Sequence, residues 1–445
     1  MTSLQDATVT TRRLLGGSPQ DLTAHLAAYG PLRLDPVATA GTAGPLVKRI
    51  LDAGLRGRGG GWFPTGQKMT IVAQSANGKR CPIIVGNGME GEPASGKDAI
   101  LLANRPHLVL DGLVLSANAL GATEIVLAVH RGSRAATTLI AAIAERTSDP
   151  IAIQLVTPPG RYVASEESAL THWIDKGLAL PTTTPPRPAE RGVLNRPTMV
   201  NNVESYAHIA LIARYGAQWY RSAGTVAAPG TTLVSVLGAV ARPVIVEVAV
   251  GTPLSGVIAL AGGLTKPVQA WLTGGYGGTW IPGSASADLP WSPEGLRVVG
   301  GTVGAGILVA LPTDVCGIHE TARVVRWMSG ESAGQCGPCR FGLAALADDF
   351  DDLATGNSSA DKLDRLWMRL GLIPGRGACK HPDGVARMAA TALEVFAADV
   401  AAHLQRRCLH GFTRTPNTAL LPIPSQARQS PVPDPRDRAA KGLWK

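Results

Sequence analysis

The chain has 445 residues, of which 45% are hydrophobic and 4% aromatic, and its formal net charge is +9. This length predicts roughly two to four domains with large apolar cores. The positive charge suits an anionic cofactor or an acidic protein partner. Nucleic-acid binding is disfavoured, because no dense Lys/Arg run with interleaved aromatic residues occurs. The longest apolar stretch, residues 108–120, is too short to cross a bilayer and residues 1–13 are polar, so we expect neither a transmembrane segment nor a signal peptide.

The cysteine pattern indicates the compartment. Six cysteines are scattered along the chain, and only Cys336 and Cys339 are close in sequence. This pattern favours metal ligands and free thiols in a reducing environment over a disulfide framework. We therefore expect a cytoplasmic protein.

Strands and helices are expected to alternate in the first half of the chain. Residues 1–45 are interpreted as an N-terminal arm with an amphipathic helix near 21–29, and residues 46–227 as an α/β domain. Within that domain we predict strands over 80–85, 124–130 and 151–157, and helices over 106–120, 133–145 and 203–215. Strands separated by helices typically form a parallel sheet, so the predicted fold class is α/β.

The second half of the chain has a different character. Residues 228–312 are expected to form a small β-rich module, with strands over 231–239, 244–250, 271–278 and 306–311 and a short helix over 253–260. Residues 313–410 are expected to be helical and contain the Cys-x-x-Cys motif. Residues 411–445 hold six Lys/Arg, two Asp and six Pro, which predicts a disordered basic tail. Such a tail is either an idle end or a docking arm for an acidic partner.

A glycine-rich loop over residues 54–68 suggests a phosphate site. It packs six glycines and the cations Arg56, Arg58 and Lys68 into fifteen residues. Glycines allow the backbone N–H groups to approach a phosphate closely, and Phe63 could lie against a planar ring. The loop fits neither the Walker pattern nor the dinucleotide fingerprint, and a flexible basic surface loop is the alternative.

Polar residues follow the predicted strands. They are Asn87, Glu90 and Glu92 after the first strand, Glu166 and Glu167 after the third, and Asn201 and Asn202 before the helix 203–215. Ligands of α/β folds bind at the carboxyl ends of parallel strands. Amides and carboxylates there could bind a flavin edge or ribose hydroxyls. The alternatives are a solvated turn for the first group and simple capping of a helix dipole for the second.

The cysteine motif suggests a metal centre. Cys336 and Cys339 lie three residues apart, and Cys379 follows in Gly-Ala-Cys-Lys-His. Two thiolates at this spacing can reach one soft metal centre, and a third from a later helix could close the site. Together with the two polar loops upstream, the motif points to a flavin that passes electrons to an iron–sulfur cluster.

Six motifs in one order carry a family resemblance. They are Gly-Leu-Arg-Gly-Arg-Gly-Gly (54–60), Phe-Pro-Thr-Gly-x-Lys (63–68), Asn-x-x-Glu-Gly-Glu-Pro (87–93), Glu-Glu-x-Ala-Leu (166–170), Pro-Thr-x-Val-Asn-Asn-Val-Glu (197–204) and Glu-Ser-x-Gly-x-Cys-x-Pro-Cys-Arg (331–340). Over about residues 20–405 the chain resembles the NADH-oxidising flavoprotein subunit of respiratory complex I, which also occurs in NAD-linked hydrogenases and formate dehydrogenases. The resemblance implies a Rossmann-like FMN domain, a β-grasp (SLBB) module and a helical bundle carrying a 4Fe–4S cluster.

The resemblance also implies roles for individual residues. FMN would be contacted by Gly57, Arg58, Gly59, Lys68, Asn87 and Glu90, and on its phosphate side by Asn201 and Asn202. Glu166 and Glu167 would flank the isoalloxazine and the nicotinamide. Phe63 would stack near the dinucleotide and Glu92 would hold its ribose, and Cys336, Cys339 and Cys379 would ligate the cluster. We take Glu92 and Glu167 as the candidate catalytic residues.

The sequence departs from the family pattern in both sites. The family's first cluster cysteine falls at Ala333, so Ser332, His381, a water or an outside group is left as the fourth ligand of a 4Fe–4S cluster, and a 3Fe–4S cluster is the alternative. A family Lys-Pro-Pro-Phe segment is Thr-Pro-Pro-Arg here (184–187), and an adenine-side Phe is Ile71. An Asp beside the flavin is Met89, and a small Gly is Trp62. Each lost aromatic stack costs about 1–3 kcal/mol.

Three functions remain open at the level of sequence. The first is a flavoprotein subunit that passes a hydride from NADH or NADPH to FMN and single electrons through the cluster to an iron–sulfur or ferredoxin-like partner. The second keeps FMN and the cluster but no longer binds nicotinamide. The third is a non-catalytic assembly scaffold. In each case the protein is expected to be cytoplasmic or peripheral to a membrane complex.

Overall fold

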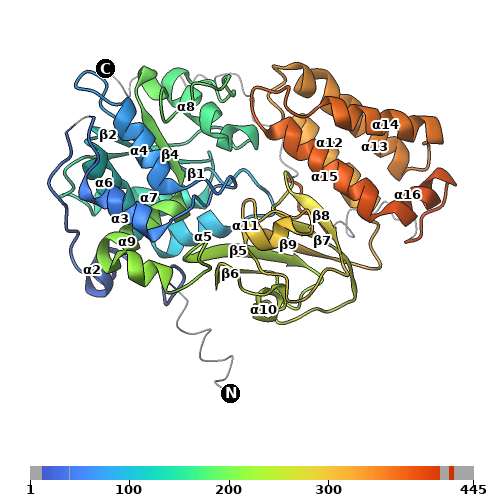
Figure 1. Ribbon diagram of the computed structural model, residues 1–445, viewed down its shortest axis with the longest axis horizontal. Helices are drawn as coiled ribbons and strands as arrows, with labels where there is room; N and C mark the ends of the chain where they lie inside the picture. Colours follow the sequence, from blue (N-terminus) through green and yellow to red (C-terminus); the bar gives the residue numbers. More distant parts are fainter. Residues whose placement is uncertain (1–12, 40, 411–419, 425–445) are drawn as a thin grey trace.

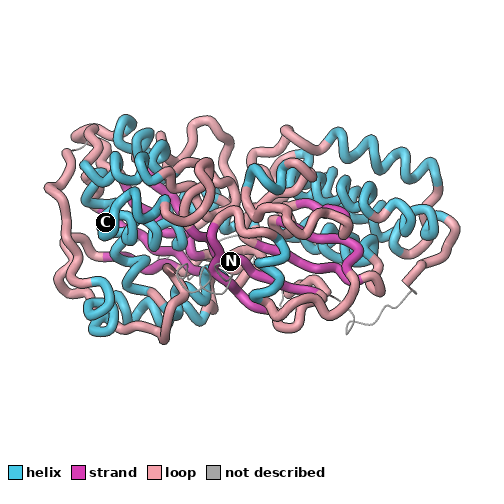
Figure 2. Tube along the Cα trace, turned by 60° about the horizontal axis from the view of Figure 1, so that its bottom comes forward, coloured by secondary structure: helices cyan, strands magenta, loops and turns pink. Residues whose placement is uncertain are grey.

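The computed structural model describes residues 13–39, 41–410 and 420–424. An α/β part formed by the first half of the chain lies at one end of the molecule, and a bundle of the last helices lies at the other (Figure 1). A second sheet lies between them. Seen from another side, the strands again form two separate groups with helices around them (Figure 2).

The first sheet has four parallel strands in the order β3-β2-β1-β4. The strands are β1 (Ile83–Gly88), β2 (Glu124–Val129), β3 (Ile153–Val156) and β4 (Thr198–Asn202). The helices of this part are α2 (Leu22–Tyr29), α3 (Pro45–Ala53), α4 (Thr65–Ser75), α5 (Lys97–Asn104), α6 (Pro106–Leu120), α7 (Arg134–Ala144), α8 (Glu167–Lys176) and α9 (Val203–Arg221). The predicted parallel α/β sheet is confirmed, and the predicted strands and helices match to within a few residues.

Strand β4 and helices α3, α4 and α5 were not predicted in this part. Strand β4 is absent from the prediction because its sequence, Thr-Met-Val-Asn-Asn, is short and half polar. Tertiary pairing with β1 makes it a strand. Helix α4 begins at Thr65, so Lys68 lies in its first turn, whereas the sequence placed that residue in the glycine-rich loop.

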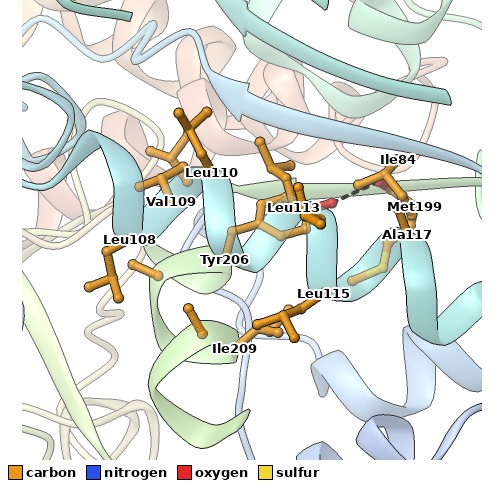
Figure 3. Packing of buried hydrophobic residues seen from close by; sticks show 14 of the residues in the cluster. Ile84, Leu108, Val109, Leu110, Leu113, Leu115, Ala117, Met199, Tyr206 and Ile209 are labelled. Carbon is orange, nitrogen blue, oxygen red and sulfur yellow. Dashed lines mark hydrogen bonds between the residues drawn. The ribbon is translucent and has the colours of Figure 1, made fainter. Parts of the chain in front are cut away.

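The core of the α/β part is formed where α6 and α9 pack on the sheet. All fifteen residues of α6 are buried. At Gly112 a Cβ would overlap the carbonyl oxygen of Tyr206, so glycine is what lets the two helices come this close. The Tyr206 hydroxyl donates to the carbonyl oxygen of Met199 on β4 at 3.0 Å (Figure 3). It also donates to the carbonyl oxygen of Val85 on β1 at 3.1 Å.

The second sheet has five strands in the order β6-β5-β9-β7-β8. Strands β5 (Thr231–Gly238) and β9 (Ile307–Pro312) are parallel to each other, and the other pairs are antiparallel. The remaining elements are β6 (Val244–Ala249), β7 (Val268–Thr273), β8 (Thr279–Pro282), α10 (Leu254–Leu260) and α11 (Pro293–Arg297). The short strand β8 was not predicted.

The last part is helical. Its elements are α12 (Gly317–Glu331), a π-helical turn η3 (Pro338–Gly342), α13 (Leu343–Ala354), α14 (Ala360–Leu372), α15 (His381–Val395) and α16 (Ala397–Leu404). One apolar cluster joins these helices to the second sheet, with Trp280 of β8 packed at 5.1 Å on Phe396. Within the described residues, no single helix is long and apolar enough to span a membrane.

Part of the predicted tail packs against the fold. Residues 420–424 are described, and Leu421 is buried in the same apolar cluster as the last helices. Its backbone N–H donates to Glu320 at 2.8 Å, and the Tyr276 hydroxyl donates to the carbonyl of Pro422 at 2.5 Å. The other residues of the predicted tail, 411–419 and 425–445, lie outside the described residues.

Candidate functional site

Three predicted segments meet at the carboxyl edge of the first sheet. Asn87 of β1 is in register with Asn202 of β4, and the Asn202 side-chain amide donates to the Asn87 carbonyl oxygen at 3.3 Å. The glycine-rich loop reaches the same edge, because a Cβ on Gly59 would lie 3.3 Å from the Cβ of Asn202. Ligands of open α/β sheets bind in this position.

Asn201 carries a polar group that the described residues do not satisfy. Its side chain is 6% exposed, and its Nδ2 atom has no hydrogen-bond partner there. A buried donor without a partner costs about 1–3 kcal/mol, so a group is expected to supply the acceptor. An oxygen of a bound FMN would satisfy it.

Lys68 and Glu167 form one wall of this region. The Lys68 ammonium donates to the Val200 carbonyl oxygen at 2.8 Å and to Glu167 at 3.0 Å. Glu167 is the first residue of α8, and Glu166 caps that helix by accepting from the backbone N–H groups of Ser168 and Ala169. Burial raises the pKa of Glu166. The capping alternative therefore describes Glu166, whereas Glu167 points at a cation on another helix.

The Arg58 side chain is held inside the fold. It is 2% exposed, and its guanidinium donates to the carbonyl oxygens of Arg56 (2.8 Å) and Thr231 (3.0 Å) and to the Tyr220 hydroxyl (3.1 Å). It also stacks on Trp62 at 4.4 Å. Arg58 therefore joins the glycine-rich loop to the second sheet. Its backbone N–H donates to the Ser205 hydroxyl at 2.9 Å, so both its N–H and its guanidinium are already engaged within the fold.

Phe63 and Gly57 hold the shape of the loop. The Gly57 N–H donates to the Phe63 carbonyl oxygen at 2.8 Å, and the Phe63 ring is 39% exposed. An aromatic ring exposed beside a candidate cofactor site is available for stacking on a planar ligand. Trp62 stands where the family has a small Gly. Its side chain is buried, and its indole N–H donates to the Gly304 carbonyl oxygen at 3.0 Å.

Glu90 caps a helix. Its carboxylate accepts from the backbone N–H groups of Asp98 and Ala99 (2.9 Å each) and from the Ser95 hydroxyl (2.7 Å). Burial, followed by the negative charge of Asp98, raises its pKa. These three bonds fix the loop after β1 to the start of α5, which is a positioning role that the sequence did not indicate.

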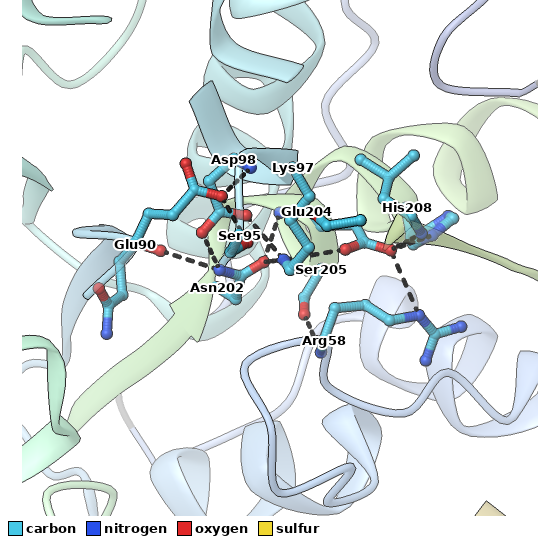
Figure 4. A network of polar contacts seen from close by, with 12 residues as sticks. Arg58, Glu90, Ser95, Lys97, Asp98, Asn202, Glu204, Ser205 and His208 are labelled. Carbon is cyan, nitrogen blue, oxygen red and sulfur yellow. Dashed lines mark hydrogen bonds and ion pairs between the residues drawn. The ribbon is translucent and has the colours of Figure 1, made fainter. Parts of the chain in front are cut away.

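A buried ionic network lies below the same edge (Figure 4). The Lys97 ammonium contacts Asp98 at 2.7 Å, Asn202 at 2.9 Å and Glu204 at 3.0 Å. Burial alone would lower the pKa of Lys97, but Asp98 and Glu204 outweigh it and raise the pKa. Sequence reasoning missed these residues, although Lys97 and Asp98 follow a few residues after Glu90 and Glu92. Both polar side-chain atoms of Asn202 therefore have hydrogen-bond partners, since its amide N–H also donates to Asp98 at 2.7 Å.

Glu92 is buried at the junction with the second sheet. It accepts from the Tyr276 backbone N–H at 3.0 Å, and it also interacts with Tyr162. Burial raises its pKa to about 8, so the carboxyl is mostly protonated at neutral pH. A neutral carboxyl can donate as well as accept a hydrogen bond, as a ribose hydroxyl would require.

The three candidate cluster cysteines are neighbours in the helical part, because Cys339 interacts electrostatically with both Cys336 and Cys379. Cys339 is buried, and Cys336 and Cys379 are half-buried. Burial first, and neighbouring thiols next, raise the pKa of Cys339 to about 12, and burial raises that of Cys379 to about 11. A bound iron ion is the kind of cation that stabilises such thiolates. The donors present thus fit an iron–sulfur cluster with three protein thiolates.

Two candidates for a fourth ligand have defined contacts. The backbone carbonyl of Ser332, and not its hydroxyl, accepts from Arg161 at 3.3 Å, and His381 uses Nε2 to contact the Met328 carbonyl at 2.9 Å. The other ring nitrogen of His381, Nδ1, is buried and has no partner among the described residues. Ala333, where the family has a cysteine, contributes no donor.

The cysteine loop is attached to the α/β part near α8. The Tyr162 N–H donates to Glu331 at 2.9 Å, and Gln335 donates to the Pro181 carbonyl at 3.2 Å. Glu166 also acts electrostatically on Cys379. The polar edge of the first sheet and the cysteine loop are therefore neighbours.

The fold and these two sites define a class of protein that combines a flavin-binding domain with an iron–sulfur domain. Three family descriptions match: Nuo51 FMN-binding domain over residues 50–211, SLBB domain over 233–279, and NADH-ubiquinone oxidoreductase-F iron-sulfur binding region over 319–403.

Curated relatives identify the family. The chain is 30% identical over 388 residues to the F 2 subunit of the NADH-quinone oxidoreductase of Rhizobium meliloti, covering 82% of this chain and 90% of the relative. It is 30% identical over 371 residues to the F subunit of the NADH-quinone oxidoreductase of Escherichia coli, covering 79% and 82%. The chain belongs to the family of NADH-quinone oxidoreductase F subunits, and the predicted resemblance is confirmed.

Two solved structures have the same fold. They are the NAD+-reducing [NiFe]-hydrogenase in its H2-reduced state (TM-score 0.75) and in its air-oxidised state (TM-score 0.76), each 29% identical. The matches cover 81% and 83% of this chain. The chain spans 62% and 64% of the two hydrogenase chains that it matches.

Proposed function

We propose that this chain oxidises NADH by hydride transfer to FMN and passes single electrons through an iron–sulfur cluster to a partner subunit. The observation that carries the proposal is the attachment of the cysteine loop to the segments before and after α8. Tyr162–Glu331 and Gln335–Pro181 hold the candidate cluster beside the candidate flavin edge. Short, rigid separation of two redox sites is what electron transfer between them requires.

The residues at the sheet edge have different roles in binding FMN. Gly59 lets the loop backbone approach the cofactor, and Asn201 offers its unsatisfied amide. Lys68 places a positive charge beside Glu167. Bound FMN would supply the capacity to take up a hydride and release electrons one at a time.

The residues at the junction serve the nicotinamide substrate. Phe63 offers an exposed ring for stacking, and Glu92 offers a neutral carboxyl for a ribose hydroxyl. Both lie on segments that flank the sheet edge, so a dinucleotide would lie between the α/β part and the second sheet.

One departure from the family pattern bears on which nicotinamide is bound. Residues 182–187, which include the Thr-Pro-Pro-Arg segment, are exposed, and Met89 is buried. The loop therefore carries a cation, Arg187, in place of an aromatic ring. An exposed guanidinium there can meet a phosphate, which is the observation behind NADPH as the alternative substrate.

Anaerobic titration of the purified, flavin-loaded protein separates these alternatives. Stoichiometric bleaching of the flavin absorbance by NADH supports the proposal, and bleaching by NADPH alone moves the substrate to NADPH. Bleaching by dithionite but by neither nucleotide leaves an FMN and iron–sulfur protein that exchanges electrons between partners. Protein that lacks both flavin and iron after reconstitution would leave only the scaffold function.

The partner is proposed on charge and family grounds. The relatives are subunits of larger enzymes by name, and this chain has a net charge of +9. An acidic iron–sulfur or ferredoxin-like protein would be attracted to it and is the expected electron acceptor. We also propose that the protein acts in the cytoplasm, free or attached to a membrane complex through other subunits.

A further inference from the structure

A second group of metal-ligating side chains lies in the helical part, outside both sites described above. It consists of Cys316, His403 and Cys408, whose ligand atoms all lie within 4.8 Å of one another. The Cys316 sulfur is 3.6 Å from Nε2 of His403. Cys316 is 5% exposed and His403 is fully buried, whereas Cys408 is half-buried.

The orientation of His403 is that of a metal ligand. Its other ring nitrogen, Nδ1, lies 2.9 Å from the carbonyl oxygen of Leu353. A carbonyl can only accept, so Nδ1 carries the proton and the lone pair of Nε2 points toward Cys316. Metal-binding histidines commonly donate their second N–H to a backbone carbonyl in this way.

The group is separate from the iron–sulfur site. Cys316 is the residue that precedes α12, whereas the loop with Cys336 and Cys339 follows the other end of that helix. A helix of fifteen residues is about 22 Å long. No residue of the group therefore contributes to the cluster held by Cys336, Cys339 and Cys379.

We propose that Cys316, His403 and Cys408 bind one zinc ion, with a water in the fourth position. Two sulfurs and one imidazole nitrogen are a donor set that zinc accepts in tetrahedral sites. Calcium and magnesium are excluded because they require oxygen ligands. Two thiolates also neutralise the charge of Zn²⁺, which allows the complex to be buried.

The ion would fasten the two ends of the helical part. Cys316 immediately precedes α12, the first helix of this part, and His403 and Cys408 lie at and beyond the end of α16, the last one. A structural zinc contributes its binding free energy directly to folding.

The test measures zinc, iron and FMN in the full-length protein purified anaerobically, with zinc chloride added and excess removed. The expected result is about one zinc ion per chain, with zinc K-edge absorption showing sulfur at about 2.3 Å and nitrogen or oxygen at about 2.0 Å. In Cys408→Ser and His403→Gln the zinc content falls at least about tenfold while FMN is retained, as expected from loss of a ligand. Cys81→Ser is the matched control, because Cys81 is a half-buried thiol in the α/β part.

A second control excludes zinc that occupies the cluster site. Cys336→Ser lowers iron but leaves zinc at about one per chain, because Cys336 belongs to the other site. The proposal is overturned if the wild-type protein holds no zinc, if Cys408→Ser and His403→Gln both keep it, or if zinc is lost with Cys336→Ser. A Cys316–Cys408 disulfide in the purified protein would also overturn it.

Discussion

Gly59 and Gly61 are two residues apart in the glycine-rich loop but have different surroundings. A Cβ on Gly59 would lie 3.3 Å from Asn202, whereas a Cβ on Gly61 would meet nothing within 4 Å. Neither residue needs a left-handed backbone. A difference in flavin binding between variants at these two positions would therefore come from the contact with the sheet edge and not from backbone strain.

We expect Gly59→Leu to lose most of its FMN, at least about tenfold, and to keep its folded structure. A bulky side chain there would separate the loop from β4 and fill the space that a phosphate or ring would occupy. The measurement is flavin per chain after gel filtration, together with circular dichroism. Gly61→Leu should retain its flavin, and full retention by both variants would place the cofactor elsewhere.

Ala333 is the residue at which the cluster site departs from the family. We expect Ala333→Cys to raise the iron content and to shift the paramagnetic resonance spectrum toward that of an ordinary reduced 4Fe–4S cluster, because a thiolate binds iron more tightly than water or a hard donor. Iron and sulfide per chain and the spectrum are compared with those of the wild type. An unchanged spectrum would mean that another ligand, such as His381, already completes the site.

The buried carboxyl of Glu92 should make the stability of the folded protein depend on pH. Its pKa is about 8 in the folded protein, against an ordinary value of 4.5, so the folded state holds a proton that the unfolded state has lost between these values. Stability then falls with rising pH in that interval, by up to about 1.4 kcal/mol for each pH unit from this group. Glu92→Gln should therefore gain stability relative to the wild type as the pH rises from 5 to 8 in thermal unfolding. The exposed Glu394→Gln is the control and should show no such trend.

At the scale of elements, the buried ions of Figure 4 join helices to strands. Lys97 begins α5, Glu204 lies in the first turn of α9, and Glu204 also accepts from the Leu233 N–H of β5 at 3.0 Å. The α/β part and the second sheet are thus joined through one buried carboxylate. Removing a single partner would leave charges buried without compensation.

We expect Lys97→Met to destabilise the protein by about 3–5 kcal/mol, because Asp98 and Glu204 would lose their cation. Lys48→Met is the matched control. Lys48 pairs with Asp52 on the surface of α3, and such a pair contributes about 0–1 kcal/mol. Urea unfolding of the two variants measures the difference. Equal effects would mean that the network contributes no more than a surface ion pair.

At the scale of the whole molecule, the contacts of residues 420–424 change how a tail truncation must be designed. Removal of everything after His410 would also remove the hydrogen bond from the Leu421 N–H to Glu320, and so would destabilise the helical part. Removal of everything after Pro424 leaves that contact intact. It takes away five Lys/Arg and two Asp, from residues 425–445.

We expect the truncation after Pro424 to keep FMN and iron but to slow electron transfer to an acidic partner at low ionic strength. Oppositely charged surfaces increase the encounter rate, and salt screens the effect. Stopped-flow rates over a salt series make the measurement. Equal rates for the full and shortened chains at every salt concentration would leave residues 425–445 without a role in encounter.

The sequence alone determined the α/β class, most strands and helices, the order of the parts and the family. Hydrophobic periodicity is local, and six motifs in one order depend only on residue type and spacing. Residues such as Asn87, Asn202 and the glycine-rich loop were correctly expected at one sheet edge, since the carboxyl ends of parallel strands lie together.

Only the tertiary structure decided how individual side chains are used. Arg58 and Glu90 look like cofactor ligands in sequence, yet one joins two parts of the protein and the other caps a helix. Strand β4 forms because it pairs with β1. Leu421 is buried because its N–H donates to Glu320 and its side chain packs against the last helices. Cys316, His403 and Cys408 are up to 92 residues apart, so no spacing rule could join them. Contacts between distant segments depend on the packing of whole helices, which no local pattern encodes.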